Sequence, residues 1–525
     1  MIAAAVPLLA ATVGLSSAQT PASPGRSAGE AAASALFDQI LASPPALRIF
    51  LKKMPKGGDL HNHLSGTPYA EEYLQWAADA GYCADESGEA IVPPPCAVGK
   101  SIKAMRDTSP FAYTHLIDAM SMRGWHQGIG RDSQSGHDQF FGSFERFGAI
   151  SDSSTAQAMA TARRLAAGDR LNYVELIHNP NALVRHTLAA GDEALNEAGL
   201  PARYDREIGQ IPAVVTAAMA ELDRDETDMR ALLGCGTPHP DPGCAPTIYY
   251  LAWGWRDLPP AQAFRSLILA FALAARDPRY VGVNIVQPED WPTATRDYDL
   301  HMAMFRFLEA RYPTVRRSLH AGELAFGQVS PQALRDHIKK AVDSGAQRIG
   351  HGAAIAFEDG AIDTLAHMAR DHIPVEVNLT SNAVILRVEG ADHPLALYRR
   401  AGVPVLLSTD DQGILRTDMT NEYVVAARQQ GLHYTDLKQM ARASLEYAFV
   451  AGRSLWEARQ PGQFAVPCRD GLDQPACQTL IKDSKKAQLQ AELEASFVKF
   501  EAVDVSEQAW LFAHHGEAAA TAARQ

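Results

Sequence analysis

Residues 315–323 read Val-Arg-Arg-Ser-Leu-His-Ala-Gly-Glu, a strand-like run that ends at His320 and is followed by Glu323. The same arrangement, a short apolar run that ends in polar residues, recurs three times downstream. The polar residues at the four run ends, His320, His351, Asn378 and Asp410, are 31, 27 and 32 residues apart. Each step is about one strand-helix unit, so the pattern predicts equivalent strand ends of a parallel α/β barrel.

Further strand-like runs occur upstream, separated by helical stretches. Together they predict an α/β fold, a (β/α)8 TIM-type barrel with disulfide-bearing insertions near residues 80–135 and 200–246 and helical additions at both ends. We expect four parts. They are a signal peptide (residues 1–18), an N-terminal segment (19–54), the barrel (55–450) and a helical C-terminal extension (451–525). The N-terminal segment begins with a flexible lead (19–35) and ends with a helix (36–54). The expected strands are Gly57–His63, Leu171–Ile177, Thr247–Ala252, Tyr280–Val286, Val315–His320, Arg348–His351, Val375–Leu379 and Val403–Thr409.

The composition excludes two classes of protein. The chain has 525 residues with 18 Phe, 15 Tyr and 7 Trp, enough aromatic side chains for a sizeable core rather than low-complexity disorder. Its formal net charge is −13, and an acidic chain is a poor match to a phosphate backbone. Nucleic acid is therefore not expected as a partner.

The first 18 residues contain no charged side chain, and an apolar run from Ile2 to Leu15 precedes Ser16-Ser17-Ala18. Small residues at the −3 and −1 positions are typical of a signal peptide, here cut near Gln19. A short membrane anchor is the alternative, although the run is shorter than the ~20 residues that span a bilayer. We expect an exported chain, periplasmic or extracellular, without stable membrane insertion.

The six cysteines form three close pairs, each in a loop rich in Pro and Gly. Near neighbours in sequence favour local disulfides, which fits an exported protein. A thiolate zinc site is the alternative, but the chain has no CxxC. The expected disulfides are Cys83–Cys96, Cys235–Cys244 and Cys468–Cys477.

Polar residues at the strand ends have the chemistry of a metal site. His61 and His63 share one face of a strand. Together with His320 and Asp410 they form a set that suits Zn²⁺, one ion per chain, and leaves one position open for water. Taken singly, an HxH can be incidental and a strand-end Asp pair can cap a helix. As a set they predict hydrolysis at an electrophilic carbon, with amide, ester, phosphoester and amidine substrates all open.

These motifs resemble those of the adenosine deaminase family of the amidohydrolase superfamily. The resemblance covers roughly residues 54–450, and the signal peptide and early cysteines are similar to the secreted deaminase/growth-factor branch. That branch implies a homodimer. The motifs that carry the resemblance are His61-x-His63, His320-Ala321-Gly322-Glu323, Gly350-His351-Gly352, Ser381-Asn382 and Ser408-Thr409-Asp410-Asp411.

The resemblance implies zinc-dependent deamination of adenosine, and of 2′-deoxyadenosine, to inosine and ammonia by attack of zinc-bound hydroxide at purine C6. Glu323 would protonate N1, and His351 would orient or deprotonate the water. Asp410 would bind the metal at the catalytic centre, and Asp411 would hydrogen-bond N7. For its role Glu323 must carry a proton, so we expect burial to raise its pKa.

Two departures from the family pattern concern substrate recognition. Ser65 stands where the family usually has an Asp that holds the ribose, and Gln287 stands near a common Gly that contacts N3. Deamination of adenine or of a modified nucleoside, or a non-catalytic exported binding protein, therefore remain alternatives. Weaker candidates are Glu376 and Asn378 as supports of the site, His178 as a pocket residue, and Trp253 and Trp255, which we expect in the core or a lid.

Overall fold

Eight parallel strands follow one another around a barrel in the computed structural model of the protein. They pair in two groups of four, β1-β4-β5-β6 and β10-β9-β8-β7. A bridge between Val283 and Arg317 joins the groups on one side, and a bridge between Asn62 and Asp410 closes the ring on the other. The barrel strands are β1 (Gly57–His63), β4 (Leu171–Ile177), β5 (Thr247–Trp255), β6 (Tyr280–Val286), β7 (Ser318–Ala321), β8 (Arg348–His351), β9 (Val375–Val377) and β10 (Val405–Leu407).

The structure describes residues 27–125, 135–189, 191 and 193–509. The signal peptide expected over residues 1–18 lies outside this part of the chain. Within it, no helix is both long and apolar enough to cross a membrane.

The expected barrel is confirmed, and the ranges predicted for β1, β4, β6 and β8 match residue for residue. The ends of the others differ for local reasons. β5 continues to Trp255, and β9 stops at Val377 because helix α16 begins at Leu379. β10 begins at Val405, since the preceding proline has no N–H to give to the ladder.

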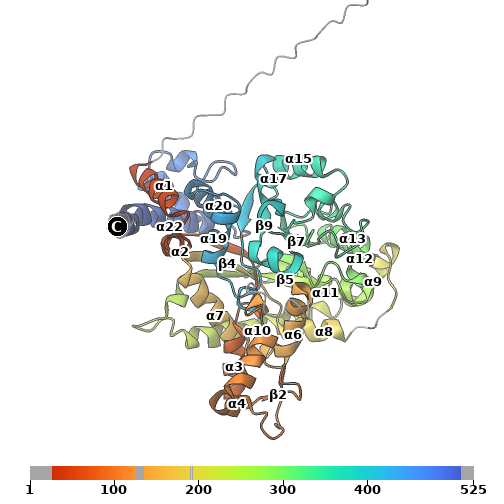
Figure 1. The fold of residues 1–525 in the computed structure, drawn as a ribbon. Coiled ribbons are helices and arrows are strands. Elements are labelled where there is room, and N and C mark those ends of the chain that lie inside the picture. Colours follow the sequence, from red (N-terminus) through yellow and green to blue (C-terminus); the bar gives the residue numbers. More distant parts are fainter. Residues whose placement is uncertain (1–26, 126–134, 190, 192, 510–525) are drawn as a thin grey trace, which may run out of the picture.

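Helices connect successive barrel strands (Figure 1), and several of them bury one face. Helix α15 (Ala361–Asp371), for example, buries Thr364, Leu365 and Met368 and exposes most of its other side chains. Apart from the helices of the first insertion, described below, the other helices that connect the barrel strands or follow the last one are α7 (Thr155–Gly168), α8 (Asn181–Leu188), α9 (Leu200–Glu207), α10 (Ile211–Leu232), α11 (Pro260–Arg276), α12 (Pro292–Arg296), α13 (Tyr298–Glu309), α14 (His337–Asp343), α16 (Leu379–Ser381), α17 (Leu395–Arg400), α18 (Gln412–Leu415), α19 (Met419–Gln429) and α20 (Tyr434–Glu446).

The N-terminal addition differs from the expected single helix after a flexible lead. It forms two helices, α1 (Ala28–Ile40) and α2 (Pro44–Lys53), so residues 28–35 are helical. The Ser27 hydroxyl accepts the Glu30 N–H and begins α1. Pro44 and Pro45 cannot continue a helix from the preceding turn, but they fit the first positions of α2.

The C-terminal extension packs against these two helices, as Figure 1 shows. It contains α21 (Pro475–Asp483), α22 (Lys485–Lys499) and a π-helical turn, Phe500–Asp504. Phe50 of α2 lies edge-on to Phe500, at 5.1 Å between ring centroids, and to Tyr434 of α20, at 5.8 Å. The two ends of the described chain thus share one aromatic cluster on the outside of the barrel.

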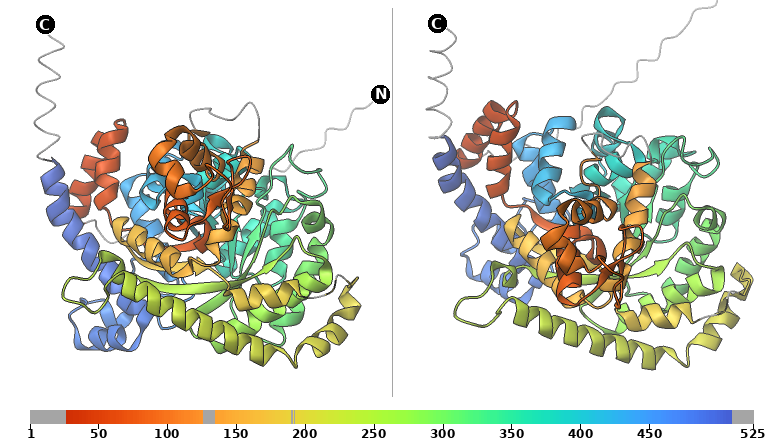
Figure 2. Two further views of the ribbon diagram at one scale, coloured as in Figure 1. Left: turned by 90° about the horizontal axis from the view of Figure 1, so that it is seen from below. Right: turned by 60° about the horizontal axis from the view of Figure 1, so that its bottom comes forward.

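The first insertion stands out from the barrel and comes forward in Figure 2. It carries the two-stranded β2–β3 ladder, which the Cys83–Cys96 disulfide holds. Its last helix leads back to the barrel and presents aromatic side chains to it. The elements are α3 (Ala70–Asp79), β2 (Cys83–Ala84), β3 (Ile91–Val92), α4 (Ile102–Thr108), α5 (Pro110–Ala119) and α6 (Gly136–Ser151).

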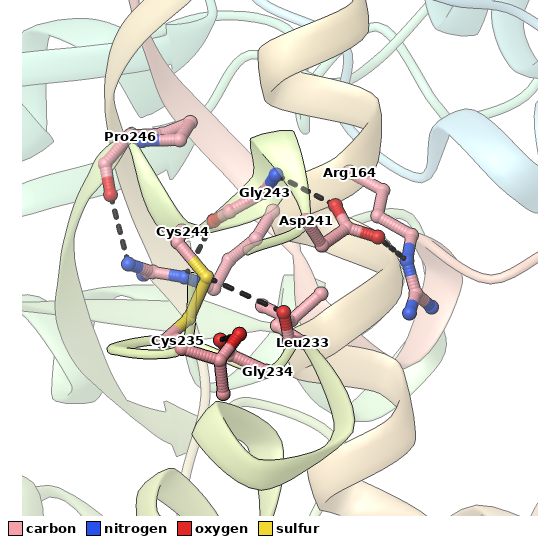
Figure 3. The surroundings of a disulfide bond; sticks show 10 residues. Arg164, Leu233, Gly234, Cys235, Asp241, Gly243, Cys244 and Pro246 are labelled. Carbon is pink, nitrogen blue, oxygen red and sulfur yellow. Dashed lines mark hydrogen bonds and ion pairs between the residues drawn. A yellow bond between two sulfur atoms is a disulfide. The ribbon is translucent and has the colours of Figure 1, made fainter. Parts of the chain in front are cut away.

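All three expected disulfides form. Cys235–Cys244 closes the loop between α10 and β5, which also lies against α7 (Figure 3). The Asp241 carboxylate accepts the Gly243 N–H at 2.7 Å and Arg164 Nε at 2.8 Å. This loop is therefore held by polar contacts as well as by its disulfide.

Two disulfides close loops of equal length, which allows a matched comparison. Removing either by a double Cys→Ser change should cost about 2–3 kcal/mol through loop entropy. The pair Cys468 and Cys477 should lose more than Cys235 and Cys244, because its side chains are fully buried and the new hydroxyls would lie in an apolar cluster. Thermal unfolding of the two double variants measures the difference, and equal losses would contradict it.

Candidate metal and catalytic site

Four side chains predicted as metal ligands converge at one end of the barrel. His320 Nε2 on β7 lies 3.0 Å from His61 Nε2 and 3.2 Å from His63 Nε2, both on β1. Asp410 Oδ1, just past β10, lies 3.5 and 3.3 Å from the same two β1 nitrogens. Tetrahedral ligands at metal–ligand distances near 2.0–2.1 Å lie about 3.3 Å apart, so these spacings fit one ion.

Hydrogen bonds on the far side of two rings leave the converging nitrogens free for a metal. His61 Nδ1 donates to Glu376 Oε2 at 2.8 Å, and His320 Nδ1 donates to Asn284 Oδ1 at 2.8 Å. A neutral imidazole whose Nδ1 carries the hydrogen has a bare lone pair on Nε2. The donor set therefore fits a metal, with Glu376 acting as a support rather than as packing alone.

The site also attracts positive charge. Burial alone would lower the pKa of His61, but the carboxylates of Asp410 and Glu376 raise it to about 10. The same two carboxylates that stabilise a proton on His61 would also stabilise a divalent cation bound there. Among the described residues, both groups of side chains that could hold a metal include Asp410; one adds His61, His320 and His351, and the other adds His63 and Asp411.

Several functional residues adopt left-handed backbone conformations. His351 has φ 66° and Asp410 has φ 59°, values that non-glycine residues rarely adopt. Barrel closure holds Asp410 there, because its N–H donates to the His61 carbonyl and its carbonyl accepts the His63 N–H. Such strain is characteristic of residues that the surrounding structure positions for function.

Glu323 is positioned by a buried carboxylate that sequence reasoning missed. Glu289, after β6, accepts the N–H groups of Gly322 and Glu323 at 3.1 and 2.9 Å. It also accepts His337 Nδ1 and pairs with Arg256. Its only sequence signal was its place three residues past a strand end. Glu289 thus fixes the turn that carries Glu323 over the site.

The environment of Glu323 favours its protonated form. Burial raises the pKa of this carboxyl well above its ordinary value, and the charges of Asp410 and Glu289 raise it further. The direction is the one expected for an acid that must enter the reaction with its proton.

His351 is neutral, and its tautomer follows from its partners. Burial lowers the pKa of His351 to about 3. The Leu395 N–H occupies His393 Nδ1, so His393 Nε2 donates to Asn382 Oδ1, which turns the Asn382 amide toward His351 Nδ1 at 3.0 Å. The hydrogen of His351 therefore lies on Nε2, which is 3.7 Å from both Glu323 Oε1 and Asp410 Oδ2.

Asp411 lies beside the converging ligands with one free oxygen. Among the described atoms its Oδ1 is buried and has no hydrogen-bond partner. Burial raises the pKa of Asp411 well above its ordinary value, and the Asp410 charge adds to this. Gly66 allows the approach, since a Cβ there would lie 1.8 Å from that oxygen.

A cavity of about 380 Å³ opens from these residues. Ser65 and Gln287, predicted as substrate-binding residues, both line it, and Gln287 has φ 86°, a conformation that favours glycine. His178 does not line it, whereas its neighbour Ile177 does. The remaining lining residues are His63, Phe140, Phe141, Phe144, Glu145, Trp253, Trp255, Asp257, Val286, Trp291, His320, Glu323, Asp410 and Asp411.

Two walls of this cavity were not expected from the sequence. Trp253 and Trp255, expected in the core or a lid, line the cavity and also pack against a small apolar cluster. Asp257 continues the same alternation, a period-2 signal visible in Trp-Gly-Trp-Arg-Asp. The aromatic residues of α6 gave no such signal, because a helix in a remote insertion reaches the barrel only through the tertiary fold.

The sequence profile described as adenosine deaminase matches residues 151–454, more than half of the chain. An aminodeoxyfutalosine deaminase of Streptomyces coelicolor is 41% identical over 132 residues, which are 25% of this chain and 32% of that protein. An adenosine deaminase of Yersinia pseudotuberculosis is 36% identical over 152 residues, 28% of this chain and 42% of that protein.

The chain thus spans about a third to two fifths of the length of these curated relatives. Among solved structures, Arabidopsis ADAL complexed with IMP has a TM-score of 0.52 at 18% identity, covering 86% of this chain and 99% of that one. That likeness concerns the fold. His61 and His63 precede the matched profile, and it is the closure of β1 against β10 that brings them to the site.

Proposed function

The chain belongs to the adenosine deaminase family, and from that premise we propose that it is a metal-dependent hydrolase that removes the 6-amino group of a purine nucleoside. Adenosine is the first substrate to test, with inosine and ammonia as products. The observation that carries the proposal is the convergence of His61, His63, His320 and Asp410 beside Glu323 at the inner end of one cavity.

We assign the metal role to the four converging residues, with Zn²⁺ as the ion that suits three imidazoles and one carboxylate. When bound, such an ion lowers the pKa of a water molecule and makes it a nucleophile near neutral pH. Glu376 and Asn284 hold the rings of His61 and His320 in the tautomer that this requires.

The chain's own residues account for the proton movements. Protonated Glu323 donates to purine N1, which draws electrons from C6. Water oxygen then bonds to C6, and the C6–N bond breaks as the two water protons move on, one to the amino group, which leaves as ammonia, and one back to Glu323. His351, with its hydrogen on Nε2, orients the water by donating to it. Asp411, whose pKa is raised, donates to N7, an atom that can only accept.

A modified adenine nucleoside is the second candidate substrate. Ser65 and Gln287 depart from the family pattern at the residues that face the sugar and base, and both line the cavity. Of the two relatives described above, the one with the higher identity is an aminodeoxyfutalosine deaminase rather than an adenosine deaminase. These observations concern which nucleoside binds and do not affect the proposed deamination chemistry.

We further propose that the enzyme works in an oxidising compartment. The three disulfides and the absence of free cysteine among the described residues support this, because such bonds persist mainly in exported proteins. Cell fractionation of the natural host, followed by thiol labelling, tests it; a chain found reduced in the cytosol would contradict export.

The function is tested by ammonia release from adenosine, 2′-deoxyadenosine and adenine. We expect turnover of at least one nucleoside, its loss after chelation, and its return on adding Zn²⁺. Metal content measured on the same samples separates loss of the ion from loss of the fold. Failure of metal-loaded protein to release ammonia from any purine would refute the proposed function and favour a binding protein.

A further inference from the structure

The outer part of the cavity has one wall built from the end of β5 and the loop after it. Trp253, Trp255 and Asp257 alternate along the chain and all face the cavity. Arg256 lies between them and turns the other way, where its Nη2 donates to the carbonyls of His320 and Ile285 and its Nη1 pairs with Glu289. Among the described residues of this wall, the one cation is therefore neutralised inside the protein.

A second wall comes from α6, on one face of the helix. Phe140, Phe141, Phe144 and Glu145 line the cavity at positions i, i+1, i+4 and i+5. The cation next to Glu145, Arg146, instead donates to the Ala119 carbonyl and pairs with Glu89 in the insertion. Both walls thus combine aromatic rings with one carboxylate and turn their arginines away.

A nearby ion pair holds α6 against the barrel. His137, at the start of α6, lies with Nε2 3.0 Å from Asp290 Oδ1, in the loop after β6, and its Nδ1 faces Asp138. Two carboxylates therefore neutralise its charge, and it does not line the cavity. Among the described lining residues there is no lysine or arginine.

Asp257 is the polar group of this outer chamber that lacks a partner. Its Oδ1 is buried and makes no hydrogen bond within the described part of the chain. A buried carboxylate oxygen without a donor costs free energy until a ligand supplies one. The two tryptophan rings that line the same cavity lie edge to face, 4.7 Å apart between centroids, and aromatic faces attract cations.

The position of the reaction determines which part of a substrate enters this chamber. Purine C6 must lie at Glu323 and the metal ligands, at the inner end of the cavity. N9 and its sugar are on the opposite side of the purine, so the 5′ end of a nucleoside points outward between the two walls.

From this geometry we infer that the outer chamber, formed by Phe141, Phe144, Glu145, Trp253, Trp255 and Asp257, is a subsite that selects the 5′ group by charge. It accepts a 5′-ammonium group or a neutral 5′-hydroxyl and rejects a 5′-phosphate. This inference rests on the proposed function, since it assumes that C6 lies at the inner end. The attraction comes from two carboxylates and the tryptophan faces, and the rejection from those carboxylates together with the absence of lysine and arginine among the described lining residues.

The experiment compares three 6-aminopurine compounds that differ only at the 5′ position: the nucleosides adenosine and 5′-amino-5′-deoxyadenosine and the nucleotide AMP. We expect kcat/KM for AMP at least about 100-fold below that for adenosine, since like-charge contacts cost several kcal/mol. The amino compound should equal or exceed adenosine. The discrimination against AMP should weaken as ionic strength rises, because salt screens it.

Two variants test the residues, with one matched control. Asp257→Asn and Glu145→Gln should each raise the AMP-to-adenosine ratio of kcat/KM by about tenfold and lower the preference for the amino compound. Glu492→Gln makes the same change of charge on the exposed face of α22 and should leave the ratios unaltered.

The possible results separate this inference from the proposed function. If adenosine and AMP are deaminated equally well, the charge-selective subsite is wrong and the deaminase remains. If no compound is deaminated, the proposed function fails, and calorimetric binding of the same three ligands tests the subsite alone. Equal binding of the 5′-phosphate and 5′-ammonium compounds would then overturn it.

Discussion

Replacing Glu323 with glutamine should reduce kcat/KM for nucleoside deamination by about 10²–10⁴-fold, the usual contribution of general acid catalysis. Glutamine keeps the shape of the side chain and has no acidic proton to give to N1. In the native protein burial holds this proton on Glu323, so activity should fall as the pH rises through its raised pKa, where the acid is lost. Steady-state rates across pH measure both effects.

Metal content distinguishes the acid role from a structural one. Glu323 is not among the converging ligands, so Glu323→Gln should retain as much metal as the native protein. Its residual rate should also lack the alkaline decline. Glu492→Gln, the same change at an exposed position, serves as the control for expression and folding. Full activity in Glu323→Gln would remove Glu323 from the mechanism.

Replacing Arg348 with methionine should destabilise the protein by about 3–5 kcal/mol, the cost of leaving buried carboxylates unpaired. Arg348 is fully buried in the barrel, where Nε pairs with Glu376 and Nη2 lies 2.6 Å from Glu175 Oε2. Glu175 also accepts the Phe449 N–H and the Tyr173 hydroxyl. Denaturant unfolding of the metal-free protein measures the loss.

The same change should weaken metal binding by about 10–100-fold, because the partners of ligands orient them. Arg348 holds Glu376, which in turn holds His61. Burial alone would raise the pKa of Glu376, but Arg348 and His61 bring it down to about 2, so it stays an acceptor. Competition with a chelator measures the affinity, and an unchanged affinity would contradict the positioning role.

A second variant separates stability from positioning. Adding Glu175→Gln to Arg348→Met removes one of the unpaired charges and should recover part of the stability. It should not recover metal affinity, since Glu376 still lacks its arginine. Recovery of both together would mean that Arg348 acts on the metal only through global stability.

Much of the barrel was predictable because its signal is local. The strands Leu171–Ile177 and Tyr280–Val286 were found to the residue, since a short run rich in apolar and β-branched residues marks a buried parallel strand within one segment. The cysteine pairs were predictable for the same reason, because each lies within one loop.

The residues that hydrogen-bond to the site residues were harder to predict from the sequence. Asn284 lies within a predicted strand and Glu289 follows it, and neither was recognised as a support of the site, whereas Glu376 was only a weaker candidate. Their contacts span tens to hundreds of positions in the chain, so no periodicity within a segment reports them. The break between α1 and α2 was a local error, since Pro44-Pro45 was a readable signal.

By itself, then, the sequence determined the barrel, the residue types at its strand ends and the three disulfides, because each depends on a pattern within a few residues. Only the tertiary structure decided which side chains from other segments those strand ends contact. Closure of β10 on β1 brings Asp410 to His61 and His63, and folding of α6 against the barrel places aromatic and acidic side chains in the same cavity as Trp253 and Trp255. Those contacts join segments far apart in the chain, and their geometry comes from packing of the whole barrel.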